Sequence, residues 1–194
     1  MLRLYNQLVN KAPILTQSLM TAGTCAVGDV VAQKVTPYLI HKYSNSSEPY
    51  KALPWDVQRT LKFGALGLCY FGPLVSFWLR FLDKAVARTG ATGNAAVIRK
   101  LVPDQFIFAP TLTVGFLCLN AYTNGVSAEK SFRSSIEQIW QVQMKAWPFW
   151  ISVQILNFSL VPLNFRLLNI QIAAILWNSF LSWFTNTQNK VTAD

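Results

Sequence analysis

The sequence is divided into long runs that contain no aspartate, glutamate, lysine or arginine. They cover residues 12–28, 63–79, 105–128, 146–165 and 167–189, and have 17, 17, 24, 20 and 23 residues. An α-helix needs roughly 20 mainly apolar residues to cross a bilayer, with about 17 as the lower limit. Each run meets that limit, and none shows the sustained polar–apolar alternation of a membrane-spanning strand. The runs predict an all-α, polytopic membrane protein.

The runs predict about four transmembrane helices in a single integral membrane domain over residues 1–194. The expected spans are residues 12–33, 61–82, 102–124 and 146–186. The last span is one long helix or two short ones, because Pro148 and Pro162 bracket the fourth run and Arg166 separates it from the fifth. A fifth hydrophobic helix is therefore the alternative. Ahead of this region, residues 129–144 predict an amphipathic interfacial helix with Phe132 and Trp140 on its apolar side.

The charged residues indicate which partner surrounds these helices. Only 13% of residues are charged, about half the usual share of a soluble domain, while the formal net charge is +9. The basic residues are scattered through the loops, with five Lys/Arg in residues 34–62 and five in residues 80–100. Basic flanks of apolar helices typically meet anionic headgroups. The expected partner is the lipid bilayer, and no nucleic-acid partner is expected because no basic cluster is present.

The residues that carry catalytic or metal chemistry are sparse. Cys25, Cys69 and Cys118 lie far apart in three apolar runs, and His41 is the single histidine. Neither a metal site nor a cofactor is predicted from this set. A nucleophilic triad would have to use His41, and no Gly-X-Ser-X-Gly sequence supports one. We therefore expect the chain not to be an enzyme.

Ionisable groups at membrane depth are the candidate functional residues, because they usually face a bundle interior or water. Asp29 and Gln33 continue a small, polar face of the first span; tight helix packing and a water-lined path are equally compatible with it. Asp104 is expected to open the third span after Pro103, ahead of a mixed stripe that favours helix contact over a conduit. That stripe comprises Asp104, Phe108, Thr111, Gly115, Cys118 and Tyr122.

Arg166 is the cation placed deepest among the apolar runs. It needs a carboxylate, backbone carbonyls or headgroups as partners, and Asp29 and Asp104 are the available carboxylates. Snorkelling to a phosphate is the alternative. The full set of predicted pore-lining or membrane-buried polar residues is Asp29, Gln33, Asp104, Gln105, Thr111, Asn157, Arg166 and Asn178.

The C-terminal third carries a long, ordered motif. Its residues are Trp147, Pro148, Gln154, Asn157, Phe158, Val161, Pro162, Arg166, Trp177 and Asn178. In order and spacing this motif resembles the Mpv-seventeen / twenty-two-kilodalton peroxisomal membrane protein family. The resemblance extends from about Leu4 to Trp183 and includes Gly28-Asp29. This chain departs from the family in carrying Ser76 and Leu79 where members commonly have His and Tyr, and its first loop is longer around residues 44–49.

The resemblance implies a small integral protein of the mitochondrial inner membrane, with the peroxisomal membrane as the alternative. It also implies a weakly selective channel for small metabolites, linked in mitochondrial members to mitochondrial DNA maintenance and stress tolerance. Asp29, Asp104 and Arg166 would then set the polarity of the pore, and Pro148 and Pro162 the helix geometry. Small-molecule solutes and a homo-oligomer are the implied partners. A non-transporting membrane scaffold is the competing function.

Overall fold

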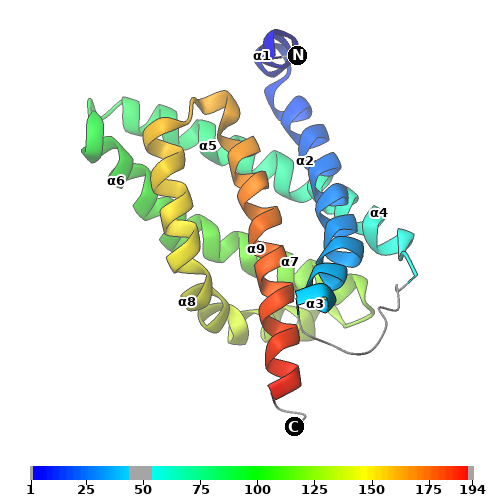
Figure 1. Ribbon diagram of the computed structural model, residues 1–194. Helices are drawn as coiled ribbons and strands as arrows, with labels where there is room; N and C mark the ends of the chain where they lie inside the picture. The colour runs from blue at the N-terminus through cyan, green and yellow to red at the C-terminus, as the bar shows by residue number, and fades with distance from the viewer. Residues whose placement is uncertain (1, 44–53, 192–194) are drawn as a thin grey trace. The chain divides into compact units, whose positions relative to one another are not determined.

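The computed structural model describes residues 2–43 and 54–191, with side chains described for residues 7–39, 41–43 and 54–177. Every regular element in that part of the chain is helical (Figure 1). Three helical stretches, Pro13–Tyr43, Val57–Ala87 and Gly93–Thr123, are long and apolar enough to cross a membrane, and Leu163–Trp177 is a shorter apolar helix. The predicted all-α, polytopic membrane fold is confirmed. The longer first loop expected around residues 44–49 lies outside the described residues.

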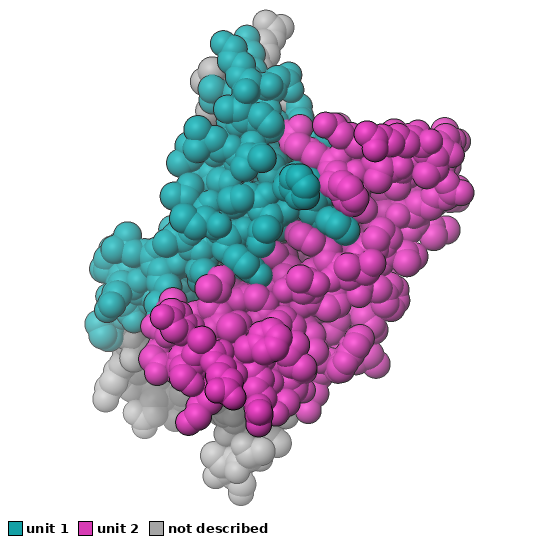
Figure 2. All heavy atoms as spheres, turned by 180° about the vertical axis from the view of Figure 1, so that it is seen from behind, with its two compact units in different colours: residues 1–79, 163–194 teal, residues 80–162 magenta. Residues whose placement is uncertain are grey.

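The chain forms two compact units, Met1–Leu79 with Leu163–Asp194 and Arg80–Pro162 (Figure 2). Unit 1 is built around α2 (Pro13–Val30). This helix packs against α4 and the π-helical segment η2 on one side and against α9 on another. The elements of unit 1 in chain order are α1 (Leu2–Lys11), α2, η1 (Val31–Val35), α3 (Thr36–Tyr43), α4 (Val57–Leu66), η2 (Gly67–Phe71), the first half of α5 (Gly72–Ala87) and α9 (Leu163–Val191).

Unit 2 is built around α8 (Ala128–Leu160), which packs against α6 (Gly93–Pro103) and α7 (Ala109–Thr123). The short π-helical segment η3 (Asp104–Phe108) joins α6 to α7 without a break. α8 ends at Leu160 and α9 begins at Leu163, so the chain breaks at Val161 and Pro162. The break is expected because Pro162 lacks an N–H and disfavours the helical conformation of the residue before it.

Each of the three long stretches contains one π-helical segment, which the sequence pattern does not reveal. The third segment corrects the expectation for Asp104. This residue does not open a helix, because the helix begins at Gly93 and Asp104 lies in its middle. Pro103 is tolerated inside the stretch, since a π-helical turn is one way in which a helix accommodates a missing backbone hydrogen bond.

The predicted interfacial helix of residues 129–144 is the first half of α8, which continues through Pro148. Its buried side is mostly small and polar, with Ser131, Ser135, Ile139 and Gln143. Its large apolar side chains point outward: Phe132, Ile136, Trp140 and Met144 are all exposed. Ile139 is the exception to the predicted apolar face, because it lies inside with the serines.

α2 shows the same inversion of polar and apolar residues. Its buried side chains are Gln17, Ser18, Thr21 and Asp29, whereas Leu15 and Leu19 are 60% and 56% exposed. Exposing leucine while burying glutamine and aspartate is unfavourable in water. It is the arrangement expected where lipid surrounds the helices and their polar groups bond to one another.

Candidate functional site

The buried face of α2 carries a cluster of hydrogen-bonded amides and hydroxyls, here called the glutamine cluster, that comprises Gln17, Thr21, Thr24, Ser76 and Gln171. Ser76 Oγ donates to Gln17 Oε1, and Gln171 Nε2 donates to Thr21 Oγ1. Thr24 Oγ1 donates to Gln171 Oε1 at 2.9 Å. Ser76 is fully buried. Within unit 1, therefore, α2, α5 and α9 meet through polar side chains.

α9 runs parallel to α2 within unit 1 (Figure 1). Contacts advance along both helices in the same order: Gln17 Nε2 donates to Asn164 O at 3.5 Å, and Gln171 contacts Thr21 and Thr24. The spacing of seven residues from Asn164 to Gln171 places both on one face of α9. α9 therefore presents the backbone carbonyl of Asn164 and the side chain of Gln171 to the polar face of α2.

Two glycines allow η2 and the start of α5 to approach α2 closely. A Cβ at Gly67 would lie 2.8 Å from the carbonyl oxygen of Thr21, and one at Gly72 would lie 2.5 Å from Cα of Ser18. No larger residue fits at either position without moving backbone. Small residues that bring backbones together are the usual packing device of membrane helices.

Asp29 lies further along α2 and forms a second group, here called the Asp29 cluster, with Gln33, Arg59 and Thr60. Its Oδ1 forms an ion pair with Arg59 Nε at 2.9 Å, and its Oδ2 accepts from Gln33 Nε2 at 2.6 Å and from Thr60 Oγ1 at 2.7 Å. The carboxylate is almost completely buried, while the Arg59 side chain is 50% exposed. The cluster therefore joins a buried charge to an accessible one.

The Asp29 cluster is fixed to the start of α4. Asp56 caps that helix by accepting from the backbone N–H of Arg59 at 2.9 Å, as N-terminal aspartates commonly do. The backbone N–H of Asp56 donates in turn to Gln33 Oε1 at 2.9 Å. Trp55 Nε1 donates to Thr60 Oγ1 at 3.0 Å. Arg59 and Thr60 are thus positioned by the local structure of a helix N-terminus.

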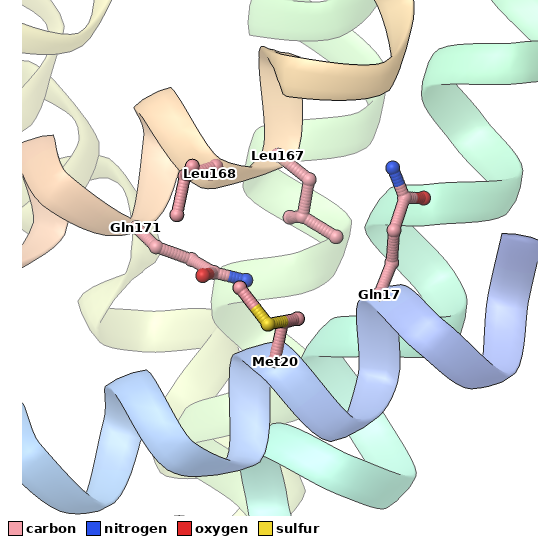
Figure 3. A pocket seen from close by; sticks show the side chains of 5 residues that line it. All are labelled: Gln17, Met20, Leu167, Leu168 and Gln171. Atoms are coloured by element: carbon pink, nitrogen blue, oxygen red, sulfur yellow. The ribbon is translucent and has the colours of Figure 1, made fainter. Parts of the chain in front are cut away.

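A narrow void borders the glutamine cluster. It is lined by Gln17, Met20, Leu167, Leu168 and Gln171 (Figure 3). The space does not admit a water-sized sphere. The polar face of α2 is therefore closed to solvent at this level.

Unit 2 contains a separate polar group, here called the Asp104 cluster, formed by Asp104, Gln105, Gln154 and Asn157. Asp104 Oδ2 accepts from Gln154 Nε2 at 2.7 Å and from Gln105 Nε2 at 2.8 Å, and Asn157 Nδ2 donates to Gln154 Oε1 at 2.9 Å. All four side chains are buried. Gln105 Oε1 has no hydrogen-bond partner among the described residues. The cluster is a continuous chain of a carboxylate and carboxamides.

The remaining predicted residues are placed as follows. Thr111 is exposed, and its hydroxyl donates to the carbonyl of Ile107 in its own helix. Arg166 is buried on α9, and the carboxylate of Asp29, one of its two predicted partners, is paired with Arg59. Asn178 lies beyond the side chains that the structure describes.

The residues of the C-terminal motif have several different structural roles. Trp147 Nε1 donates to the carbonyl of Gln105 at 3.3 Å, which fastens α8 to η3. Phe158 is buried, and Pro148 lies inside α8 without ending it. Val161 and Pro162 form the break before α9.

Sequence reasoning left several cluster members off the predicted list, namely Gln17, Thr21, Thr24, Arg59, Thr60, Ser76, Gln154 and Gln171. A usable signal existed for Gln17 and Thr21, which share the polar face of α2 with Asp29 at helical spacing. No helical spacing linked Arg59 and Thr60 to Asp29, because about 30 residues of chain separate them from it. Within the described residues, no group of three His, Cys, Asp or Glu is arranged to hold a metal ion.

Comparison with known proteins places this geometry in a family. A profile described as the Mpv17 / PMP22 family matches residues 121–182. PXMP2/4 family protein 2 of Dictyostelium discoideum is 32% identical over 92% of this chain and 88% of its own length. Protein SYM1 of Gibberella zeae is 37% identical over 94% and 95%. Mitochondrial inner membrane protein Mpv17 of Danio rerio is 33% identical over 95% and 96%. No solved structure matches.

Proposed function

Because the chain belongs to the Mpv17 / PMP22 family, we propose that it forms a weakly selective channel for small hydrophilic metabolites. It is a multi-pass protein of the mitochondrial inner membrane. The relatives named mitochondrial inner membrane protein Mpv17 align with nearly the whole length of this chain. Solute passage of this kind is the proposed link to mitochondrial DNA maintenance and stress tolerance.

The observation that carries the proposal is the polar face of α2, called here the polar track, which carries the glutamine cluster in its first part and the Asp29 cluster at its end. From Gln17 to Gln33 the track covers about 24 Å at 1.5 Å per residue. The hydrocarbon core of a bilayer is roughly 30 Å thick. Polar side chains along one buried helix face therefore cover most of the distance that a solute has to cross.

The chemistry of the track favours weak selectivity. The glutamine cluster consists of neutral amides and hydroxyls, which can bond to a solute's hydroxyls, carboxylates or phosphates without a fixed charge preference. In the Asp29 cluster the carboxylate and the guanidinium of Arg59 largely neutralise each other, because they form an ion pair at 2.9 Å. Such a path would exclude apolar molecules and distinguish solutes mainly by size.

The described conformation is closed, since the void beside Gln17 and Gln171 admits no water. Conduction through the track would require α2 and α9 to separate and water to replace the hydrogen bonds of Gln171. Those bonds are exchangeable for bonds to water at small net cost, because a typical intramolecular hydrogen bond contributes only about 1 kcal/mol.

Recording from purified protein in planar bilayers tests the proposal. Wild type is expected to show discrete openings, and Asp29→Asn is expected to shift the ratio of cation to anion permeability, because it removes the carboxylate facing Arg59. Asp104→Asn reports whether unit 2 also lines a conduit. Glu137→Gln, the same change at an exposed position of α8, is the matched control. Silence from folded wild-type protein would reject the channel.

A membrane scaffold is the second candidate, and the closed packing of the track favours it. A hydrogen-bonded interior with no room for water is also what a purely structural helix bundle requires. A scaffold predicts a stable partner that copurifies in mild detergent, and no change in that association or in mitochondrial function in Asp29→Asn. Discrete openings in the bilayer would count against it.

A further inference from the structure

The polar track is interrupted between its two clusters. Thr24 ends the glutamine cluster and Asp29 begins the next, and no hydrogen bond joins the two clusters among the described side chains. Gly28 lies in this interval and has no side chain of its own. At this level of unit 1 the track is lined by apolar surface.

Ile175 of α9 fills the interval. A Cβ built on Gly28 would lie 3.4 Å from Cγ1 of Ile175, so the isoleucine occupies the space next to the glycine and leaves room for little more than a methyl group there. Ile175 is four residues, about one helical turn, beyond Gln171. Because α2 and α9 run parallel, the amide of Gln171 meets the hydroxyls of Thr21 and Thr24. One turn further along α9, Ile175 meets Gly28.

We propose that the contact of Ile175 with Gly28 is the gate of the polar track. The inference rests on the channel proposed above and adds how that channel is closed. A short apolar constriction between polar segments excludes water, because a water molecule inside it loses hydrogen bonds and gains none, and such dewetted constrictions stop the passage of ions and polar solutes. Gly28 allows the seal to form, since a Cβ at this position would already be in van der Waals contact with Ile175 and a bulkier side chain would displace it.

The gate opens when α9 moves away from α2. The hydrogen bonds of Gln171 to Thr21 and Thr24 lie one turn away and hold the two helices together. They are exchangeable with water, whereas the apolar contact is not, so wetting of the constriction is the slow step. Separating the helices joins the glutamine cluster to the Asp29 cluster as one hydrated path.

Single-channel recording of Ile175→Ser tests the gate. Ile172 lies on the same helix and is 53% exposed, so Ile172→Ser is a control with the same chemical change outside the track. A hydroxyl in the constriction lets water enter, and we expect the open probability of Ile175→Ser to rise about tenfold, the effect of a modest shift in a two-state equilibrium. Ile172→Ser should behave as wild type.

A reversible cross-link provides a second measurement. With Cys25, Cys69 and Cys118 replaced by serine, the pair Gly28→Cys and Ile175→Cys should form a disulfide on oxidation. A Cβ at Gly28 would lie 3.4 Å from Cγ1 of Ile175, which is one bond from its Cβ, and disulfides join Cβ atoms about 3.5–4.5 Å apart. The cross-link should abolish openings, and reduction should restore them. Gly28→Cys alone is the control for the substitution itself.

The outcomes separate the two proposals. Openings in wild type together with equal open probabilities for Ile175→Ser and Ile172→Ser overturn the gate and leave the channel standing. Undiminished openings through a quantitatively cross-linked pair do the same. Silence of both wild type and Ile175→Ser, with cross-linking intact, overturns the channel and the gate together.

Discussion

Asp29 and Asp104 are both buried carboxylates beside a π-helical segment, but they are held by different groups. Asp29 meets the half-exposed guanidinium of Arg59, a hydroxyl and one carboxamide. Asp104 accepts from two carboxamides, Gln105 and Gln154, which are as buried as it is. Asp29 is paired with a half-exposed cation of unit 1, whereas both amides that bond to Asp104 are buried.

The difference indicates separate roles. A buried carboxylate with an exposed cationic partner can change partners when a charged solute or proton arrives at the surface. Replacing a carboxylate that accepts from buried amides costs more stability, because each buried amide left without an acceptor costs free energy. We therefore expect Asp104 to dominate stability and Asp29 to dominate selectivity.

The largest expected effect is at the centre of the Asp104 cluster. Asp104→Leu should lower the free energy of unfolding by about 3 kcal/mol, since two buried amide donors lose their acceptor and each such loss costs roughly 1–3 kcal/mol. Unfolding in mixed micelles, followed by tryptophan fluorescence, measures it. Asp104→Asn keeps one acceptor oxygen and should cost less; equal losses for both variants would mean that the charge rather than the acceptor stabilises unit 2.

Gln154 tests whether the Asp104 cluster acts as a chain. Gln154→Leu removes a donor to Asp104 and the acceptor of Asn157, and should lower the free energy of unfolding by about 2 kcal/mol. Ser152→Ala, two residues away at an exposed position with a bond only to its own helix, is the control. A loss no greater than that of Ser152→Ala would show that the cluster contributes no stability.

Arg59 tests the partly exposed site. Arg59→Ala should lower the free energy of unfolding by about 1.5 kcal/mol, because buried Asp29 loses a charged partner that is itself half solvated and keeps its hydrogen bonds from Gln33 and Thr60. In bilayers, however, it should raise cation over anion permeability, since Asp29 keeps its charge without a cationic partner. Arg59→Lys should restore part of the wild-type selectivity. A larger stability loss than in Asp104→Leu would reverse the comparison between the two sites.

Thr111 should show the smallest effect. Its side chain is exposed and bonds to its own helix, so Thr111→Val should change the free energy of unfolding by no more than about 0.5 kcal/mol. The variant should also conduct as wild type does. A change in conductance would return α7 to the set of candidate pore-lining helices.

Helical spacing predicted some neighbours well and others poorly. Gln33 was expected on the face of Asp29, and its side chain does bond to that carboxylate. The stripe expected from Asp104 through Thr111 to Tyr122 does not hold together, because Asp104 is buried while the other two are exposed. A π-helical turn at Asp104–Phe108 shifts every following residue around the helix axis relative to an α-helical count.

The sequence by itself determined that the chain is helical, crosses a membrane and carries a polar face on its first long apolar helix. These follow from local rules, since segment length, apolar content and spacing along one helix are read directly from residue order. The tertiary structure decided that Arg59 pairs with Asp29, that Gln171 meets Thr21 and Thr24, and that Ile175 rests on Gly28. Each of these contacts joins helices that are distant in sequence. Only the packing of backbones brought together by small residues selects which polar group finds which partner.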